Sequence, residues 1–313
     1  MATGATPRNA ATMGCNLTEP GHSGQWPRLG LLNKYTRVTP YADYGSAFGR
    51  LQRCSADAQL EARHSMMLEI VATGAARIGI LVTPEQLALL ARYVEFLLAR
   101  NQQLNLTRIV EPAEVERRHL LDSLTCALPV LDRLSEAQAP AGPALRCIDI
   151  GSGGGLPGIP LAIVFPGLQM TLLESAGKKA AFLREAAAAL GLENVSVIVA
   201  RAEDAARDPD TRESFDLAVA RALAPLDVAL ELCLPFVKPG GLLILPRGSD
   251  LEAQLPAGQG AAEELAARLR DPIPLDDPEL PPGRSLVVAE KLGPTPARFP
   301  RRAGMAAKRR ARA

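Results

Sequence analysis

The chain has 313 residues, of which 47% are hydrophobic and 22% are charged, and its formal net charge is +1. This balance excludes a wholly disordered chain, and no apolar run approaches the roughly 18 residues of a membrane helix. The near-neutral charge, taken alone, argues against a nucleic-acid partner. No secretory signal is visible at the N-terminus. Five cysteines without a CxxC pair are typical of unpaired thiols, which predicts a reducing cytoplasm.

Residues 1–66 differ from the rest of the chain in composition. They are rich in Gly, Pro, Ser, Thr and Asn and have no sustained period of 2 or 3.6 residues. We expect a mostly disordered leader. It is also a candidate for a segment absent from the native protein, which would then start at Met66 or Met67.

The first regular segment is helical. Thr83 is a predicted N-cap, Pro84 suits the first helical position, and Gln86 completes a capping box. A second helix is expected to begin near Pro112. On it, the spacing of Arg118 and Asp122 predicts a local ion pair.

From residue 145 onward, short apolar runs alternate with helical segments. The predicted strands are Leu145–Ile150, Met170–Glu174, Val195–Val199, Phe215–Ala220 and Leu242–Leu245. The predicted helices between them are Leu161–Phe165, Lys178–Leu190, Ala202–Arg207 and Val228–Val237. This alternation predicts an α/β fold with a mostly parallel, doubly wound sheet. A late strand, Ser285–Glu290, is expected at a sheet edge in antiparallel orientation, after a loop over Asp271–Gly283.

A glycine-rich loop, DIGSGGG at Asp149–Gly155, follows the first predicted strand. Such a loop lets a ligand approach the backbone at the carboxyl edge of the sheet. Its spacing fits two cofactors. GxGxxG with Glu174 about 20 residues further on is typical of a dinucleotide site. GxGxG preceded by Asp149 suits S-adenosylmethionine (AdoMet), whose ammonium or its water faces the acid and whose ribose hydroxyls face Glu174.

Two further loops follow strands at the same edge. Ala202 and Glu203 come after the third strand and would flank the adenine of AdoMet. Arg221 comes after the fourth strand, near the methionine end of the cofactor or the incoming base. Each charged residue alone is more simply explained by a surface salt bridge. Charged loops after consecutive strands weaken that explanation.

A series of short motifs now resembles one family, the RsmG (or GidB) family of bacterial small-subunit ribosomal RNA methyltransferases. The motifs are NLT (Asn105–Thr107), RHLLDS (Arg118–Ser123), DIGSGGGLPGIP (Asp149–Pro160), LLESAGKK (Leu172–Lys179), FLRE (Phe182–Glu185), RAE (Arg201–Glu203), Phe215–Asp216, RAL (Arg221–Leu223) and KPGG (Lys238–Gly241). The resemblance covers about residues 67–310. RHLLDS together with GLPGIP is specific, whereas the glycine loop is generic to methyltransferases.

The resemblance implies a class I, Rossmann-like, AdoMet-dependent methyltransferase that modifies N7 of a guanine in the 530 loop of 16S rRNA. By motif match it implies AdoMet contacts at Gly151, Leu156, Ala202, Glu203 and Arg221. From composition and patterning we expect a leader (1–66), a small helical N-terminal subdomain (67–143), an AdoMet-binding domain (144–297) and a basic tail (298–313). The leader has no counterpart in the family pattern. One departure is Arg247, where the family usually has Lys, since the two differ in reach and geometry.

The chemistry requires no catalytic side chain. Guanine N7 is already a nucleophile, so we assign no general base and no metal, and the enzyme works by positioning N7. His119 is either a base contact or, more simply, a packed helix residue. Two alternatives stay open: an NAD(P)-dependent oxidoreductase on a similar loop, and a non-catalytic RNA-binding protein. The expected partner is 16S rRNA or the small ribosomal subunit, with no membrane, in the cytoplasm.

The basic C-terminal tail explains why the net charge of the whole chain is close to zero. Residues 298–313 carry seven basic side chains and no acid, whereas residues 67–297 carry 21 basic and 30 acidic ones. The net charge is therefore a cancellation and does not exclude RNA. We expect phosphate contact to depend on local patches, the tail above all.

Overall fold

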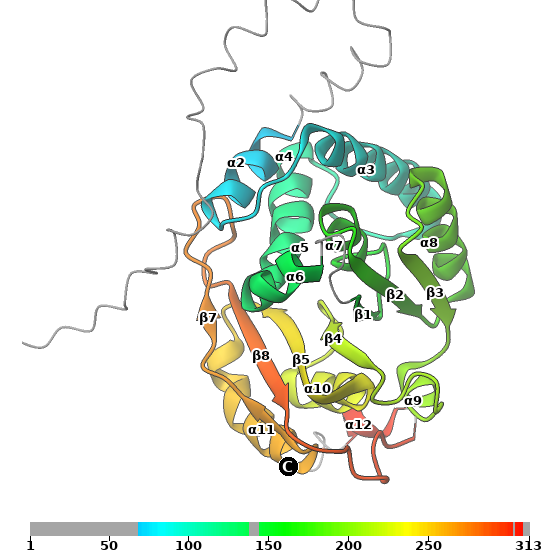
Figure 1. Ribbon diagram of the computed structural model, residues 1–313, viewed down its shortest axis with the longest axis vertical. Helices are drawn as coiled ribbons and strands as arrows, with labels where there is room; N and C mark the ends of the chain where they lie inside the picture. Colours follow the sequence, from blue (N-terminus) through cyan, green and yellow to red (C-terminus); the bar gives the residue numbers. More distant parts are fainter. Residues whose placement is uncertain (1–67, 138–143, 303, 309–313) are drawn as a thin grey trace, which may run out of the picture. The chain divides into compact units, whose positions relative to one another are not determined.

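The computed structural model describes residues 68–137, 144–302 and 304–308 (Figure 1). The predicted leader and its alternative start residues lie outside the described residues, as do residues 309–313 of the tail. The boundaries predicted for the domains stay predictions.

One sheet organises the described part of the chain. Its strands are β1 (Leu145–Ile150), β2 (Leu168–Glu174), β3 (Val195–Val199), β4 (Phe215–Val219), β5 (Val237–Arg247), β6 (Ala267–Leu269), β7 (Ile273–Pro274) and β8 (Ser285–Lys291). Their order is β3-β2-β1-β4-β5-β8-β6, and β7 pairs with β8. Strands β1 to β5 are parallel to one another, whereas β8 is antiparallel to β5 and to β6. The mostly parallel sheet and the antiparallel late strand are confirmed. The edge position of that strand is wrong, because β6 lies outside it.

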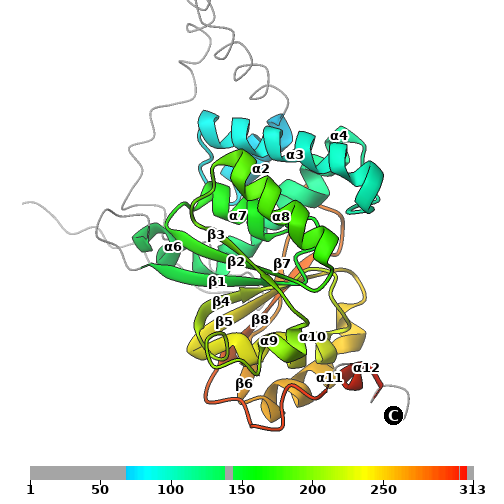
Figure 2. The ribbon, with the colours of Figure 1, turned by 90° about the vertical axis from the view of Figure 1, so that its right-hand side faces the viewer.

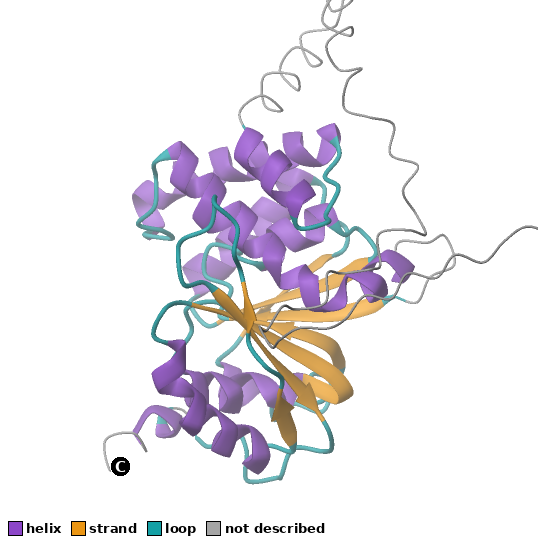
Figure 3. Ribbon diagram, turned by 90° about the vertical axis from the view of Figure 1, so that its left-hand side faces the viewer, coloured by secondary structure: helices purple, strands orange, loops and turns teal. Residues whose placement is uncertain are grey.

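Helices cover both faces of the sheet (Figures 2 and 3). They are α7 (Gly158–Val164), α8 (Gly177–Leu190), α9 (Ala202–Ala205), α10 (Leu226–Cys233) and α11 (Leu251–Glu264). Successive strand residues enter different cores, as period-2 geometry requires. Cys147 packs with α7 and α8, whereas Ile148 packs with α9, α10 and α11. The sheet is therefore doubly wound, as predicted.

The N-terminal helices are α2 (Glu69–Arg77), α3 (Pro84–Leu104), α4 (Pro112–Val115), α5 (Asp122–Leu124) and α6 (Leu131–Ala137). All except α4 contribute residues to the first of these cores. The predicted capping box is present, because Thr83 Oγ1 accepts from Gln86 N at 3.2 Å and Thr83 N donates to Gln86 Oε1 at 3.0 Å. The predicted second helix is a series of short elements. A π-helical turn (116–121) lies between α4 and α5, and a 3-10 segment (125–130) follows α5.

Candidate cofactor and nucleotide site

The glycine loop joins β1 to α7 and is fixed to the neighbouring strand. The N–H groups of Gly151 and Ser152 both donate to the carbonyl oxygen of Leu173, at 2.8 and 3.1 Å. Gly151 has a φ of +71°, and a Cβ there would lie 2.7 Å from Leu223 Cδ1. Only glycine therefore combines this backbone conformation with this close approach.

Two buried carboxylates hold the loop from behind. Glu174, at the end of β2, accepts from Gly153 N at 3.0 Å and from Ala176 N at 2.8 Å. Asp149, at the end of β1, accepts from Gly158 N at 3.0 Å through Oδ2. Its other oxygen, Oδ1, has no hydrogen-bond partner among the described residues, and burial raises the pKa of Asp149 to about 6.

This pattern fits the cationic end of AdoMet. A buried carboxylate oxygen without a partner gains stability from a positive group or its water at the adjoining loop. Glu174 has accepted one backbone hydrogen bond at each oxygen, and a carboxylate oxygen has capacity for another. The residues present therefore fit the predicted cofactor.

The other predicted cofactor residues lie at neighbouring strand ends. Leu156 is buried in the turn before α7. Ala202 is the first residue of α9, three residues after Val199 ends β3, and is half-buried. Glu203 accepts from the N–H of Gly304 at 3.2 Å, so this acid already contacts the C-terminal segment. Leu156, Ala202 and Glu203 therefore lie at the same carboxyl edge of the sheet as the glycine loop.

Arg221 is directed toward the N-terminal helices. Its Nη1 donates to the carbonyl oxygen of Arg118 at 2.6 Å and to Asp122 Oδ2 at 3.2 Å. Arg284, from the start of β8, donates to the same carboxylate through Nε at 2.8 Å and through Nη2. Asp122 is 2% exposed, so one buried acid pairs with two arginines. The predicted local pair of Arg118 and Asp122 is wrong, because Arg118 lies 3.6 Å from Glu114 instead.

His119 is buried beside this cluster. Burial and the Arg221 cation lower the pKa of His119 to about 4, so the ring is neutral near pH 7. Its Nε2 lies 2.6 Å from Thr107 Oγ1. His119 is thus packed in its turn and also lines the cavity that the next paragraph describes.

A cavity of about 880 Å³ opens at this edge of the sheet. Its lining comes from five segments that are far apart in sequence, and it includes four arginines: Arg118, Arg221, Arg247 and Arg284. Arg247, the residue that departs from the family pattern, donates from Nη1 to the carbonyl oxygen of Ala224 at 2.7 Å. Its Nε is buried with no partner in the described part of the chain. The cavity is therefore rich in arginine donors, and its lining also includes the carboxylates of Asp122 and Asp250.

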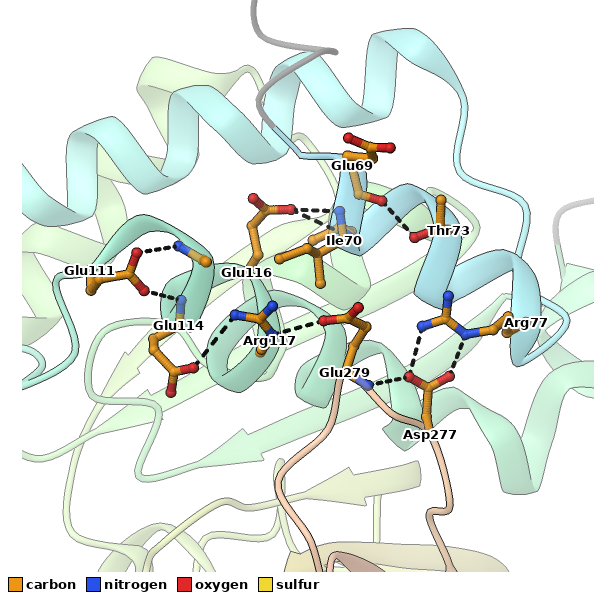
Figure 4. Close-up of polar contacts among 12 residues, drawn as sticks. Glu69, Ile70, Thr73, Arg77, Glu111, Glu114, Glu116, Arg117, Asp277 and Glu279 are labelled. Atoms are coloured by element: carbon orange, nitrogen blue, oxygen red, sulfur yellow. Dashed lines mark hydrogen bonds and ion pairs between the residues drawn. The ribbon is translucent and has the colours of Figure 1, made fainter.

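A loop before β8 forms one wall of the cavity and is fastened to the N-terminal helices (Figure 4). Asp277 accepts two hydrogen bonds of 2.8 Å from Arg77 on α2, and Glu279 accepts one of 2.8 Å from Arg117. The adjacent Glu116 accepts from two N–H groups in the first turn of α2. These contacts hold in place the segment that carries Arg284.

Comparison with known proteins identifies the family. The model of the GidB family, rRNA small subunit methyltransferase G, matches residues 86–269. The chain belongs to this family. The ribosomal RNA small subunit methyltransferase G of Pelotomaculum thermopropionicum is 42% identical over 247 residues, which cover 78% of this chain and 99% of that protein. The enzyme of the same name from Moorella thermoacetica is 43% identical over 234 residues, covering 74% and 92%.

Among solved structures, a fibrillarin pre-rRNA processing protein of Methanococcus jannaschii is 15% identical, with a TM-score of 0.38, over 48% of this chain and 67% of that one.

The family assignment makes this chain an rRNA small-subunit methyltransferase and implies AdoMet as methyl donor, in preference to the oxidoreductase and non-catalytic alternatives. No helix of the described residues is long and apolar enough to cross a membrane.

Proposed function

We propose that this protein transfers the methyl group of AdoMet to N7 of a guanine in the 530 loop of 16S rRNA, acting in the cytoplasm on the small ribosomal subunit or its RNA. The family supports ribosomal RNA as the substrate. The observation that carries the choice of N7 is the donor-rich cavity beside Arg221. The N7 and O6 edge of guanine carries acceptors only, so an arginine that donates to O6 would hold the base and leave the N7 lone pair free to react.

The cofactor would lie along the strand ends next to this cavity. In this proposal the glycine loop at Gly151 and Leu156 holds the methionine part, Glu174 accepts from the ribose hydroxyls, and Ala202 and Glu203 flank the adenine. Arg221 lies between the cofactor and the incoming base. AdoMet supplies an electrophilic methyl group, and the protein supplies alignment.

The side chains of the cavity agree with a reaction that needs no general base. The Asp122 carboxylate is occupied on both oxygens by Arg221 and Arg284. The low pKa of His119, about 4, makes its neutral ring a weak base. Methylation at N7 would require no proton transfer, because the N7 lone pair would form the new bond to the methyl group that AdoMet supplies and the neutral thioether would leave. Correct placement of N7 is then the main requirement.

The test uses 16S rRNA in small subunits from a strain that lacks the enzyme. We expect transfer of tritium from labelled AdoMet, and chain scission at a single guanine in the 530 loop after borohydride and aniline treatment, which cleaves RNA at 7-methylguanosine. A matched transcript with 7-deazaguanine at that position should accept no label. Equal labelling of the 7-deaza RNA would refute N7 as the acceptor, and scission outside the 530 loop would refute the target.

A further inference from the structure

We propose that four basic side chains at the carboxyl edge of the sheet, Arg108, Lys178, Lys179 and Arg201, bind the phosphates of the substrate RNA. We call these four residues the basic rim. The inference rests on the proposed function, because RNA is the substrate there, and it adds the surface that holds the RNA.

Strand topology brings the rim together. Lys178 and Lys179 lie in the first turn of α8, four and five residues after Glu174 ends β2. Arg201 follows β3 and precedes α9. Because β1, β2 and β3 are parallel, these residues lie at the same edge as the glycine loop.

Arg108 reaches this edge from the loop after α3. The residues on either side of it are fixed there. A Cβ on Gly154 of the glycine loop would lie 3.7 Å from Leu106 Cβ, which puts the two loops in contact. Thr107 Oγ1 lies 2.6 Å from His119 Nε2, and Ile109 lines the cavity. Arg108 is therefore held beside both the glycine loop and the arginine-lined cavity.

The rim side chains have no internal counterion in the described part of the chain. Within residues 68–137, 144–302 and 304–308, none of the four makes an ion pair or a side-chain hydrogen bond, and three are exposed while Lys179 is half-buried. By contrast, several other surface bases form ion pairs. Arg100 pairs with Glu185, and Lys238 pairs with Asp216. Arg268 and Arg270 both pair with Glu290.

The acids described at this edge, Asp149, Glu174, Glu203 and the exposed Asp204, form no ion pair with the rim. Asp149 and Glu174 are buried and accept hydrogen bonds from the backbone. Glu203 is engaged by the N–H of Gly304. Exposed positive charge without a partner, next to a nucleotide-sized cavity, fits a polyanion whose chain passes over the edge.

The described part of the tail is less suited to this role than its composition indicates. Arg298 lies 3.7 Å from Glu264 and stacks 5.0 Å from the Phe299 ring centre. The Arg301 guanidinium donates from Nε to Oε1 of the buried Glu231 carboxylate at 2.9 Å, and the backbone N–H of Arg301 donates to the same oxygen at 3.0 Å. These two arginines anchor the C-terminal segment to α10 and α11. In the described tail, exposed Arg302 has no such partner.

The test is the salt dependence of RNA binding. Each phosphate contact in single-stranded RNA contributes about 0.7 to the slope of log affinity against log salt. The double variant Lys178→Gln, Lys179→Gln should therefore lower the slope by about 1.4, so that a fourfold rise in salt costs the wild type about seven times more affinity than the variant. Arg108→Gln with Arg201→Gln should behave alike. The matched control is Arg268→Gln with Arg270→Gln, whose bases are paired and should leave the slope unchanged.

The probe is a short 16S rRNA fragment that contains the 530 loop, titrated with full-length protein in increasing KCl. AdoMet affinity by calorimetry should match the wild type in every variant, which shows that the fold and cofactor site are intact. An unchanged slope in both rim variants, or an equal fall in the control, would overturn the proposal. If the rim variants lower the slope while the wild type fails to methylate guanine N7, the rim stands and the proposed reaction fails.

Discussion

Replacement of Asp122 by asparagine tests whether the cavity depends on one buried carboxylate. Asp122 is 2% exposed and accepts hydrogen bonds from Arg284 Nε at 2.8 Å and from Arg221 Nη1 at 3.2 Å. It thereby joins the N-terminal helices to the end of β4 and the start of β8. Asparagine keeps the shape of the side chain and removes its charge.

The expected loss of unfolding free energy depends on the solvent exposure and the hydrogen bonds that Arg221 and Arg284 keep in the variant. Removal of one partner from a buried ion pair costs about 3–5 kcal/mol, because the remaining charge has no counterion. Here Arg221 and Arg284 have side chains that are 15% and 18% exposed, and the asparagine oxygen still accepts a hydrogen bond. These features reduce the expected loss of unfolding free energy to about 2–3 kcal/mol. Because both guanidiniums line the cavity, kcat/KM for RNA should fall by about tenfold or more.

The assay is urea unfolding of each variant together with steady-state methylation of the RNA substrate. Glu290→Gln is the control, since its partner Arg268 is 66% exposed and such a pair contributes about 0–1 kcal/mol. Arg284→Gln combined with Asp122→Asn should cost less than the sum of the single changes, because the two residues contact each other. A loss in Asp122→Asn no larger than in Glu290→Gln, or full additivity of the double variant, would refute the reasoning.

Three further outcomes are expected. Burial raises the pKa of Asp149 to about 6 in the free protein, and the AdoMet ammonium favours the ionised carboxylate. AdoMet binding should therefore release a proton, and AdoMet affinity should increase as pH rises from about 5 to about 7. Calorimetry should find this dependence lost in Asp149→Asn. Arg301→Gln should lower the unfolding free energy by about 2–4 kcal/mol, because the buried Glu231 loses its partner. The slope of log RNA affinity against log salt should stay unchanged. A lowered slope with normal stability would contradict this. Gly158→Ala would place a Cβ 2.4 Å from Leu172 Cδ2, so thermal unfolding should reveal a loss of about 1–3 kcal/mol.

The sheet was predictable because its strands are short apolar runs between turn residues. The bounds predicted for β1 and β3 are those of the structure. The position of β8 within the sheet was not predictable. The strand outside it, β6, has only three residues, too few to show the alternation of apolar and polar residues that marks a strand. Helix α11 was not predicted either. Pro256 and Gly258 lie inside it, and Gly258 is needed there because a Cβ would lie 2.5 Å from Leu226 Cδ2.

The site divides in the same way. Residues after strands, such as Glu174 and Arg221, were predictable because parallel topology brings strand ends to one edge. The pairing of Asp122 with Arg284 spans 162 residues, and only the tertiary fold brings them together. Local spacing favoured a helix pair with Arg118, which is wrong. An available signal was the acid itself: Asp122 lies among apolar helix residues, and a buried acid needs a partner.

Net charge misleads for this chain because burial and pairing sort the charges. Residues 67–297 contain more acids than bases, which predicts repulsion of RNA if the charge is averaged over the surface. At the carboxyl edge, however, Asp149 and Glu174 are buried, whereas Lys178 and Arg201 are exposed without partners in the described chain. Screening limits each charge to about 10 Å at 0.1 M salt, so the RNA responds to this edge rather than to the whole body. Under the proposed function, the basic rim would therefore attract RNA despite the acidic balance of residues 67–297.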